Sequence, residues 1–198
     1  MNLSELPQSI IDRFFEFQHL PHDIKSRWTK KYYLIQSSNI PYFRIIFKDD
    51  KYIYKIFYDK TIINAFNTAI ERNFFNNIAI IKNFITYNNQ KIGYVTQVFD
   101  MAQGIKMKRT VKMISKLEDQ SPEFINLYDR ICQNIVKTNI AYMDIYPTNI
   151  VKYQKKFYII DLDSVIDLNK TKMSTIDNGY GSLPPYYIEF IKRYIKLK

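Results

Sequence analysis

The pattern of apolar residues changes character halfway along the chain, and this change restricts the fold more than any other feature. Between about residues 32 and 99, apolar residues come in short runs separated by turn-forming polar residues, which is typical of β-strands. Strands are predicted at 32–35, 42–47, 52–58, 84–87 and 92–99. After Gly104 the apolar residues recur every three or four positions, which predicts helices. The sequence therefore predicts an α+β chain.

Helix signals complete the predicted order of elements. The predicted helices lie at about 4–19, 61–75 (capped by Thr61), 105–117, 121–135 (capped by Ser121) and 186–197, and a hairpin is predicted from 150–153 and 157–160. This order predicts two lobes. Residues 1–99 form an N-terminal lobe with an N-terminal helix, a five-stranded antiparallel sheet and one further helix, and residues 100–198 form a reduced, mostly helical C-terminal lobe.

The scarcity of three residue types excludes several kinds of site. The four glycines are at positions 93, 104, 179 and 181, so a glycine-rich phosphate loop before residue 92 is impossible. Cys132 is the single cysteine and cannot form a disulfide within the chain. His19 and His22 both lie near the N-terminus, so no Cys/His cluster is available for structural zinc. Catalysis in the rest of the chain must use carboxylates, amides and lysines.

The charge of the chain allows two interpretations. There are 29 Lys and Arg against 19 Asp and Glu, which gives a net charge of +10. Such an excess is found in nucleic-acid-binding domains, but the abundance of Ile, Lys, Asn, Tyr and Phe also matches the codon usage of an AT-rich genome. No apolar run reaches the roughly 20 residues of a membrane helix. Early charges argue against a signal peptide, so we expect a soluble, intracellular, cytoplasmic protein.

Acidic and amide side chains flank the predicted hairpin. Asp144 and Asn149 lie five positions apart on the loop before it, and Asp161 and Asp163 follow its second strand. A short hairpin brings its two ends together, so we expect Asp144, Asn149 and Asp161 to converge. Carboxylate and amide oxygens are the ligands of Mg²⁺, and a further carboxylate can orient a hydroxyl nucleophile.

These residues resemble the motifs of the protein-kinase-like superfamily. Asp144 and Asn149 match its catalytic-loop Asp and metal-binding Asn, and Asp161 matches the Asp of its Asp-Phe-Gly motif. Lys55, in Tyr-Lys-Ile-Phe, resembles the lysine of Val-Ala-Ile-Lys, and Glu71 follows 16 positions later (71 − 55) inside a predicted helix. The resemblance covers about residues 32–163. It is nearer to lipopolysaccharide sugar kinases, RIO kinases and the small kinase of the KEOPS complex than to conventional protein kinases.

The resemblance implies a kinase-like fold and an ATP-dependent phosphotransferase with Mg²⁺ or Mn²⁺. Lys55, held by Glu71, would position the phosphates, and Asp144 would orient the acceptor hydroxyl. The remaining implied contacts are the nucleotide-covering loop (Ser37, Ser38, Asn39), the adenine-binding hinge (Phe99, Met101) and the metal ligands (Asn149, Asp161). Asp163 allows two interpretations, either a second metal contact or a cap or turn carboxylate.

Three departures from the superfamily pattern bear on activity and substrate. The nucleotide-covering loop, Gln36–Pro41, contains no glycine. Tyr142-Met143 replaces the usual His-Arg, so control by activation-loop phosphorylation is not expected. The chain ends at residue 198, which leaves no room for a full peptide-binding platform, so the acceptor can be a small molecule, a sugar or a protein bound differently. The alternatives are a pseudokinase or scaffold that retains the fold, and a basic nucleic-acid-binding domain.

Overall fold

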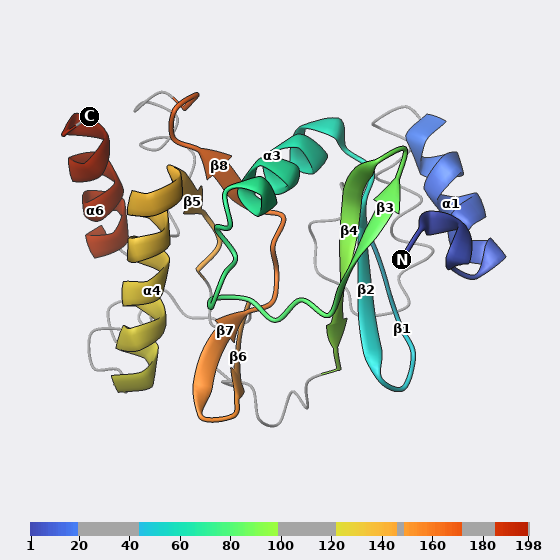
Figure 1. The fold of residues 1–198 in the computed structure, drawn as a ribbon, viewed down its shortest axis with the longest axis horizontal. Coiled ribbons are helices and arrows are strands. Elements are labelled where there is room, and N and C mark those ends of the chain that lie inside the picture. The colour runs from blue at the N-terminus through green and yellow to red at the C-terminus, as the bar shows by residue number, and fades with distance from the viewer. Residues whose placement is uncertain (20–43, 99–121, 146–148, 172–184, 198) are drawn as a thin grey trace. The chain divides into compact units, whose positions relative to one another are not determined.

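The computed structural model describes residues 1–19, 44–98, 122–145, 149–171 and 185–197 (Figure 1). Helices and strands both occur along these ranges, which confirms the predicted α+β class. The chain divides into two compact units, one of residues 1–67 and 81–98 and the other of residues 68–80 and 99–198. The division into lobes at residue 99 stays a prediction.

An antiparallel sheet forms the centre of the first unit. Its strands are β1 (Arg44–Lys48), β2 (Tyr52–Phe57), β3 (Asn83–Tyr87) and β4 (Gln90–Gln97), in the spatial order β1-β2-β4-β3. β4 is the most deeply buried of them, with residues 92–96 all buried. The fifth predicted strand, 32–35, lies outside the described residues.

Polar residues form the two tight turns of this sheet. The Asp49 carboxylate accepts hydrogen bonds from the Lys51 and Tyr52 N–H groups at 2.8 and 2.7 Å and closes the β1–β2 turn. Asn88 and Asn89 adopt φ angles of 48° and 62° and join β3 to β4 as a two-residue turn. Positive φ at both central positions is the conformation that matches the twist of a hairpin. The predicted loop of four residues, 88–91, is therefore two residues too long.

Gly93 is required by the close approach of two strands. It lies opposite Ile56 in the β2–β4 register, beside an irregularity of the β3–β4 pairing between Ile85 and Thr86. A Cβ atom at position 93 would lie 2.1 Å from the carbonyl oxygen of Lys55, a contact that only backbone movement could relieve. The glycine thus allows β2 and β4 to pair along their full length.

We expect the Gly93→Ala substitution to lower the free energy of unfolding by about 3 kcal/mol, because the new methyl group meets backbone and not a mobile side chain. Urea denaturation of the two proteins measures the difference. Gln97→Ala in the same strand is the control and should change stability by less than about 0.5 kcal/mol. Equal unfolding midpoints for Gly93→Ala and the unsubstituted chain would contradict the steric explanation.

Helix α3 (Lys60–Glu71) follows β2, and both of its ends differ from the predicted ones. Its N-terminal cap is Asp59, whose carboxylate accepts the N–H groups of Thr61 and Ile62 at 2.8 and 3.2 Å, so Thr61 is not the cap. The helix ends at residue 71 and not near 75, because Asn73 adopts a left-handed φ of 60°. The Phe74 N–H then bonds the Ala69 carbonyl at 2.8 Å, as is common at helix C-termini.

The N-terminal segment packs on β3. A short 3-10 helix, η1 (Leu3–Glu5), begins with a capping box of Asn2 and Glu5 and is followed by helix α1 (Gln8–His19). Asn2 forms a parallel bridge with Thr86 of β3. Leu3 and Phe14 are 1% and 0% exposed, so both segments contribute to the core of the first unit.

Among its described residues, the second unit contains two further helices and two short antiparallel ladders. The helices are α4 (Pro122–Thr138) and α6 (Pro185–Lys196), and the strands are β5 (Ile140–Tyr142), β6 (Ile150–Tyr153), β7 (Lys156–Ile159) and β8 (Val165–Asp167). β5 pairs with β8, and β6 pairs with β7 as the predicted hairpin. The predicted helix at 105–117 lies outside the described residues.

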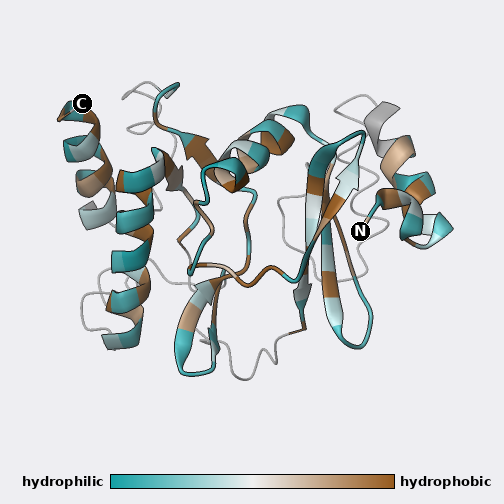
Figure 2. Cartoon of the chain, in the orientation of Figure 1, coloured by the Kyte–Doolittle hydropathy of each residue, from teal (hydrophilic) through white to brown (hydrophobic). Residues whose placement is uncertain are grey.

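Helix α4 buries one side, as its sequence pattern predicts. Hydrophilic and hydrophobic residues alternate along it (Figure 2), and the apolar residues of the predicted stripe are buried: Phe124, Leu127, Ile131 and Ile135. The 17-residue helix starts at Pro122, which suits the first position because its missing N–H would have had no partner there. Within the described ranges, no helix is both long and apolar enough to cross a membrane.

Candidate functional site

The carboxylates that the sequence predicts to be functional lie next to the ends of two antiparallel ladders, β5–β8 and β6–β7. Beyond the last β5–β8 pair, Tyr142 with Val165, the Met143 N–H donates to the Ser164 carbonyl at 2.7 Å. Before the first β6–β7 pair, the Ile160 N–H donates to the Asn149 carbonyl at 2.9 Å. Asp144 and residues 161–163 therefore follow or precede the two ladders directly, and Asn149 stands at the start of one of them.

Asp144 and Asn149 contact one another directly. The Asn149 side-chain amide donates to the Asp144 carboxylate at 2.6 Å and to the Asp144 carbonyl at 3.1 Å. Both residues are half-buried. A bond to an ionised carboxylate is stronger than one between neutral groups, so it fixes the orientation of both side chains. Because the NH₂ group makes these bonds, the amide oxygen of Asn149 points away from Asp144.

Asp161 lies two residues beyond the end of β7 and is deeply buried. Its exposed fraction is 7%, and the neighbouring Leu162 is 1% exposed. Burying an ionised carboxylate costs several kcal/mol unless cations or hydrogen-bond donors compensate for the lost water. A carboxylate at this depth is therefore suited to binding a cationic group.

Asp163 is half-buried at a bend of the chain. Its carboxylate accepts a hydrogen bond from the Ser164 hydroxyl at 3.4 Å. Residues 161–164 do not form a strand, so their spacing alone does not place Asp163 on the same side as Asp161. Its function as a metal ligand stays a prediction.

Lys55 lies in the first unit, in the middle of the sheet. It pairs with Ile46 of β1 and with Tyr94 of β4, and its ammonium group lies 5.9 Å from the centre of the Tyr94 ring. Only 8% of the residue is exposed. Glu71 is exposed at the C-terminal end of α3 and belongs to the second unit. The pairing of Lys55 with Glu71 stays a prediction.

Few charged residues are buried in the described part of the chain. Among the residues that the structure describes, Lys55 and Asp161 are the two charged residues in the buried class. Both are positions that the sequence assigns to phosphate and metal binding. The other predicted nucleotide contacts, Ser37, Ser38, Asn39, Phe99 and Met101, lie outside the described residues.

The described part of the chain contains no group of three or more His, Cys, Asp or Glu side chains that could hold a metal ion by themselves. The donor atoms of the predicted set are nevertheless of the kind that Mg²⁺ prefers, since Asn149 offers an amide oxygen and Asp161 a carboxylate. A cation bound by these two residues would need further oxygen ligands, such as nucleotide phosphates and water.

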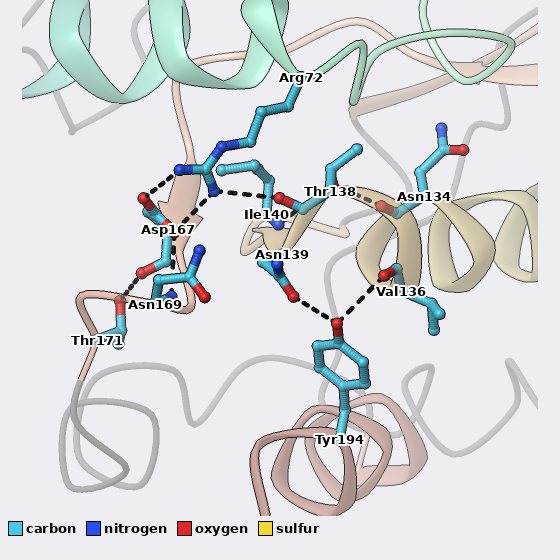
Figure 3. A network of polar contacts seen from close by, with 10 residues as sticks. All are labelled: Arg72, Asn134, Val136, Thr138, Asn139, Ile140, Asp167, Asn169, Thr171 and Tyr194. Carbon is cyan, nitrogen blue, oxygen red and sulfur yellow. Dashed lines mark hydrogen bonds and ion pairs between the residues drawn. The ribbon is translucent and has the colours of Figure 1, made fainter. Parts of the chain in front are cut away.

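Two residues that the sequence reasoning missed hold the ladder next to Asp144. Arg72 donates to the Thr138 carbonyl at 3.1 Å and to both carboxylate oxygens of Asp167 at 3.0 Å (Figure 3). Tyr187 of α6 is fully buried and its hydroxyl donates to the Tyr142 carbonyl at 2.7 Å. Neither contact has a local sequence signal, because Arg72 and Asp167 are 95 positions apart and Tyr187 and Tyr142 are 45 apart.

The Arg72–Asp167 pair keeps Asp167 ionised. Burial of Asp167 acts to raise its pKa, but the hydrogen bonds from Arg72 and from the Asn169 N–H, together with the charge of Arg72, outweigh this effect. The pKa of Asp167 therefore lies below its usual 3.8. A carboxyl whose pKa is lower in the folded state stabilises the fold above its unfolded pKa, and this contribution disappears as the pH falls through the folded pKa.

We expect Asp167→Asn to lower the free energy of unfolding by about 2 kcal/mol at neutral pH, because a charged, two-pronged hydrogen bond is lost. The difference from the unsubstituted chain should be smaller at a pH below the usual carboxyl pKa of 3.8 than at neutral pH, because the unfolded chain takes up its proton there and the stabilisation disappears as the pH falls through the lowered folded pKa. Urea denaturation at both pH values measures it. A difference that is the same at both pH values would contradict the assignment of this stabilisation to the ionised carboxylate.

Comparisons with known proteins add distant structural similarity. No family model matches the sequence, and no curated protein matches it. Among solved structures, the streptomycin-ATP-APH(2")-IIa ternary complex matches with a TM-score of 0.31 and 11% sequence identity, over 91% of this chain and 85% of that one. That structure contains streptomycin and ATP. At this TM-score the similarity carries no argument about the activity of the present chain.

Proposed function

We propose that the chain is a kinase-like phosphotransferase that transfers the γ-phosphoryl group of ATP to a hydroxyl acceptor. The observation that carries the proposal is the burial of Lys55 and Asp161, which are 8% and 7% exposed. Buried ionisable groups are expensive and are concentrated at functional sites. A lysine suits the phosphates of a nucleotide, and an aspartate suits the cation that accompanies them.

The contact between Asp144 and Asn149 supports the same proposal. Phosphoryl transfer needs little covalent chemistry from the protein, so positioning and charge neutralisation account for most of the rate. Asp144, oriented by the Asn149 amide at 2.6 Å, is suited to accept a hydrogen bond from the acceptor hydroxyl and to take its proton. The same bond leaves the amide oxygen of Asn149 for a cation.

Asn149 and Asp161 would hold Mg²⁺ or Mn²⁺. Held there with ATP, such an ion would supply positive charge to neutralise the charge that develops on the phosphates. The backbone bond from Ile160 to Asn149 brings the two ligands to the same end of the hairpin. Glu71 would orient Lys55, and Asp163 would contribute a second metal contact. The acceptor would be a small molecule, a sugar or a protein.

We expect Mg²⁺ to stabilise the chain only when ATP is present, because Asn149, Asp161 and Asp163 alone would leave several of the ion's coordination positions without a protein oxygen. In a thermal-shift measurement, Mg²⁺ with ATP should raise the melting temperature by a few degrees, and Mg²⁺ alone should not. At ligand concentrations about 100 times the Kd the stabilisation is about 2.7 kcal/mol.

The variant Asp161→Asn should lose the metal-dependent part of this shift and retain its fold. Asp129→Asn is the matched control, since Asp129 is exposed on α4. The same metal-dependent shift in Asp161→Asn as in the unsubstituted chain would remove Asp161 from the metal site.

We expect Asp144→Asn to lower the rate of phosphoryl transfer by roughly 10²–10⁴-fold, because an amide cannot take a proton from the acceptor. Slow ATP hydrolysis, with water as the acceptor, provides a readout that needs no identified substrate and is followed as ADP release. The affinity for ATP should stay within about twofold of the unsubstituted value. Full hydrolysis activity in Asp144→Asn, with Asp129→Asn as reference, would refute the role of Asp144.

A further inference from the structure

The ladder next to Asp144 is short. β5 and β8 form three residue pairs, which are Ile140 with Asp167, Ala141 with Ile166, and Tyr142 with Val165. Two-stranded ladders are marginally stable without other support. Asp144 follows β5 by two residues and Asp163 precedes β8 by two. The position of Asp144 therefore depends on whatever holds the two strands together.

Arg72 binds β8 and the residues just before β5, at the end of the ladder that is farther from Asp144 along both strands. Its guanidinium donates to the Thr138 carbonyl, two residues before β5, and to both carboxylate oxygens of Asp167, the last residue of β8 (Figure 3). The Leu168 N–H donates to the Asn139 carbonyl at 2.8 Å and continues the backbone pairing past Asp167. One side chain thus connects the entry of β5 to the exit of β8.

The environment of Thr138 favours a cation at this point. Thr138 is the last residue of α4, and the terminal carbonyl groups of a helix have no partner within the helix and carry partial negative charge. The Thr138 hydroxyl bonds back to the Asn134 carbonyl at 2.6 Å and accepts the Ile140 N–H at 3.2 Å. The chain between α4 and β5 is therefore held from both sides.

We propose that Arg72 is a positioning residue for Asp144, because its bonds to Thr138 and Asp167 clamp one end of the β5–β8 ladder whose other end carries Asp144. This inference rests on the proposed function, which gives Asp144 its catalytic role. Arg72 acts through backbone and touches neither nucleotide nor acceptor.

The geometry requires arginine and not only positive charge. A guanidinium can donate to two carboxylate oxygens and to a carbonyl at the same time, whereas a lysine ammonium is a single point of charge. The Asp167 side chain is 10% exposed and the Arg72 side chain 34%, so the pair is partly shielded from solvent. Breaking a shielded pair leaves a buried partner uncompensated, which loosens the segments that it joined.

The test compares Arg72→Met and Arg72→Lys with the unsubstituted chain in steady-state ATP hydrolysis and in hydrogen–deuterium exchange. In Arg72→Met we expect kcat to fall at least about tenfold with the KM for ATP unchanged, because the acceptor-side group moves and nucleotide contacts do not. Exchange of the Met143 amide should become at least about tenfold faster. Arg72→Lys should give intermediate values for both.

Glu123→Gln is the matched control. It breaks another ion pair of the second unit, between Glu123 and Lys152 at 3.7 Å, where both side chains are more than 40% exposed. This pair does not join β5 or β8, so kcat and Met143 exchange should stay at the unsubstituted values. If Arg72→Met does not fold, Asp167→Asn takes its place and should shift both readouts in the same direction by a smaller factor.

Failure of the clamp and failure of the proposed function give different results. If the unsubstituted chain hydrolyses ATP and kcat is unchanged in Arg72→Met or Asp167→Asn, the positioning role of Arg72 is refuted and the proposed function is not affected. An unsubstituted chain that binds ATP without hydrolysing it overturns the proposed function. In that case the exchange rate of the Met143 amide in Arg72→Met decides. An unchanged rate refutes the positioning role of Arg72, and a faster rate supports Arg72 as the residue that holds the backbone next to residue 144.

Discussion

The candidate site depends on two backbone hydrogen bonds, from Met143 to Ser164 and from Ile160 to Asn149. They extend the β5–β8 and β6–β7 ladders toward each other, so that few residues remain between them on either side. An extended residue spans about 3.3 Å, so side chains that are a few residues apart along the chain between the two ladders stay close to one another. This arrangement agrees with the direct contact between Asp144 and Asn149.

In the first unit, a charged side chain is buried within the sheet. Lys55 lies between β1 and β4, where the long aliphatic stem of lysine can pack against apolar neighbours. The strand beside it approaches so closely at Gly93 that no side chain fits. The Lys55 ammonium group lies 5.9 Å from the centre of the Tyr94 ring of β4, and only 8% of the residue is exposed.

Local signals in the sequence account for most of the elements and for one contact of the site. The spacing of apolar residues around Pro122 predicts α4, and the turn residues after β1 and β3 predict the strands of the sheet within a few positions. The hairpin predicts that Asp144, Asn149 and Asp161 converge, and the structure shows the contact between Asp144 and Asn149. β5 and β8 are too short to show a period, and the end of α3 depends on the left-handed conformation of Asn73. The partners of Arg72 and Tyr187 come from distant parts of the chain, so no local rule could reveal them.

Asparagine occupies most of the left-handed backbone positions in the described part of the chain. Among the described residues, no glycine has a positive φ, and the left-handed positions are filled by Asn73, Asn77, Asn88, Asn89, Asn139, Gln154 and Lys155. Glycine samples far more backbone conformations than asparagine when the chain is unfolded. A chain with asparagine at such positions therefore loses less entropy on folding, by about 0.4–1 kcal/mol for each turn position that it occupies without strain. The low glycine content thus also lowers the conformational entropy of the unfolded chain.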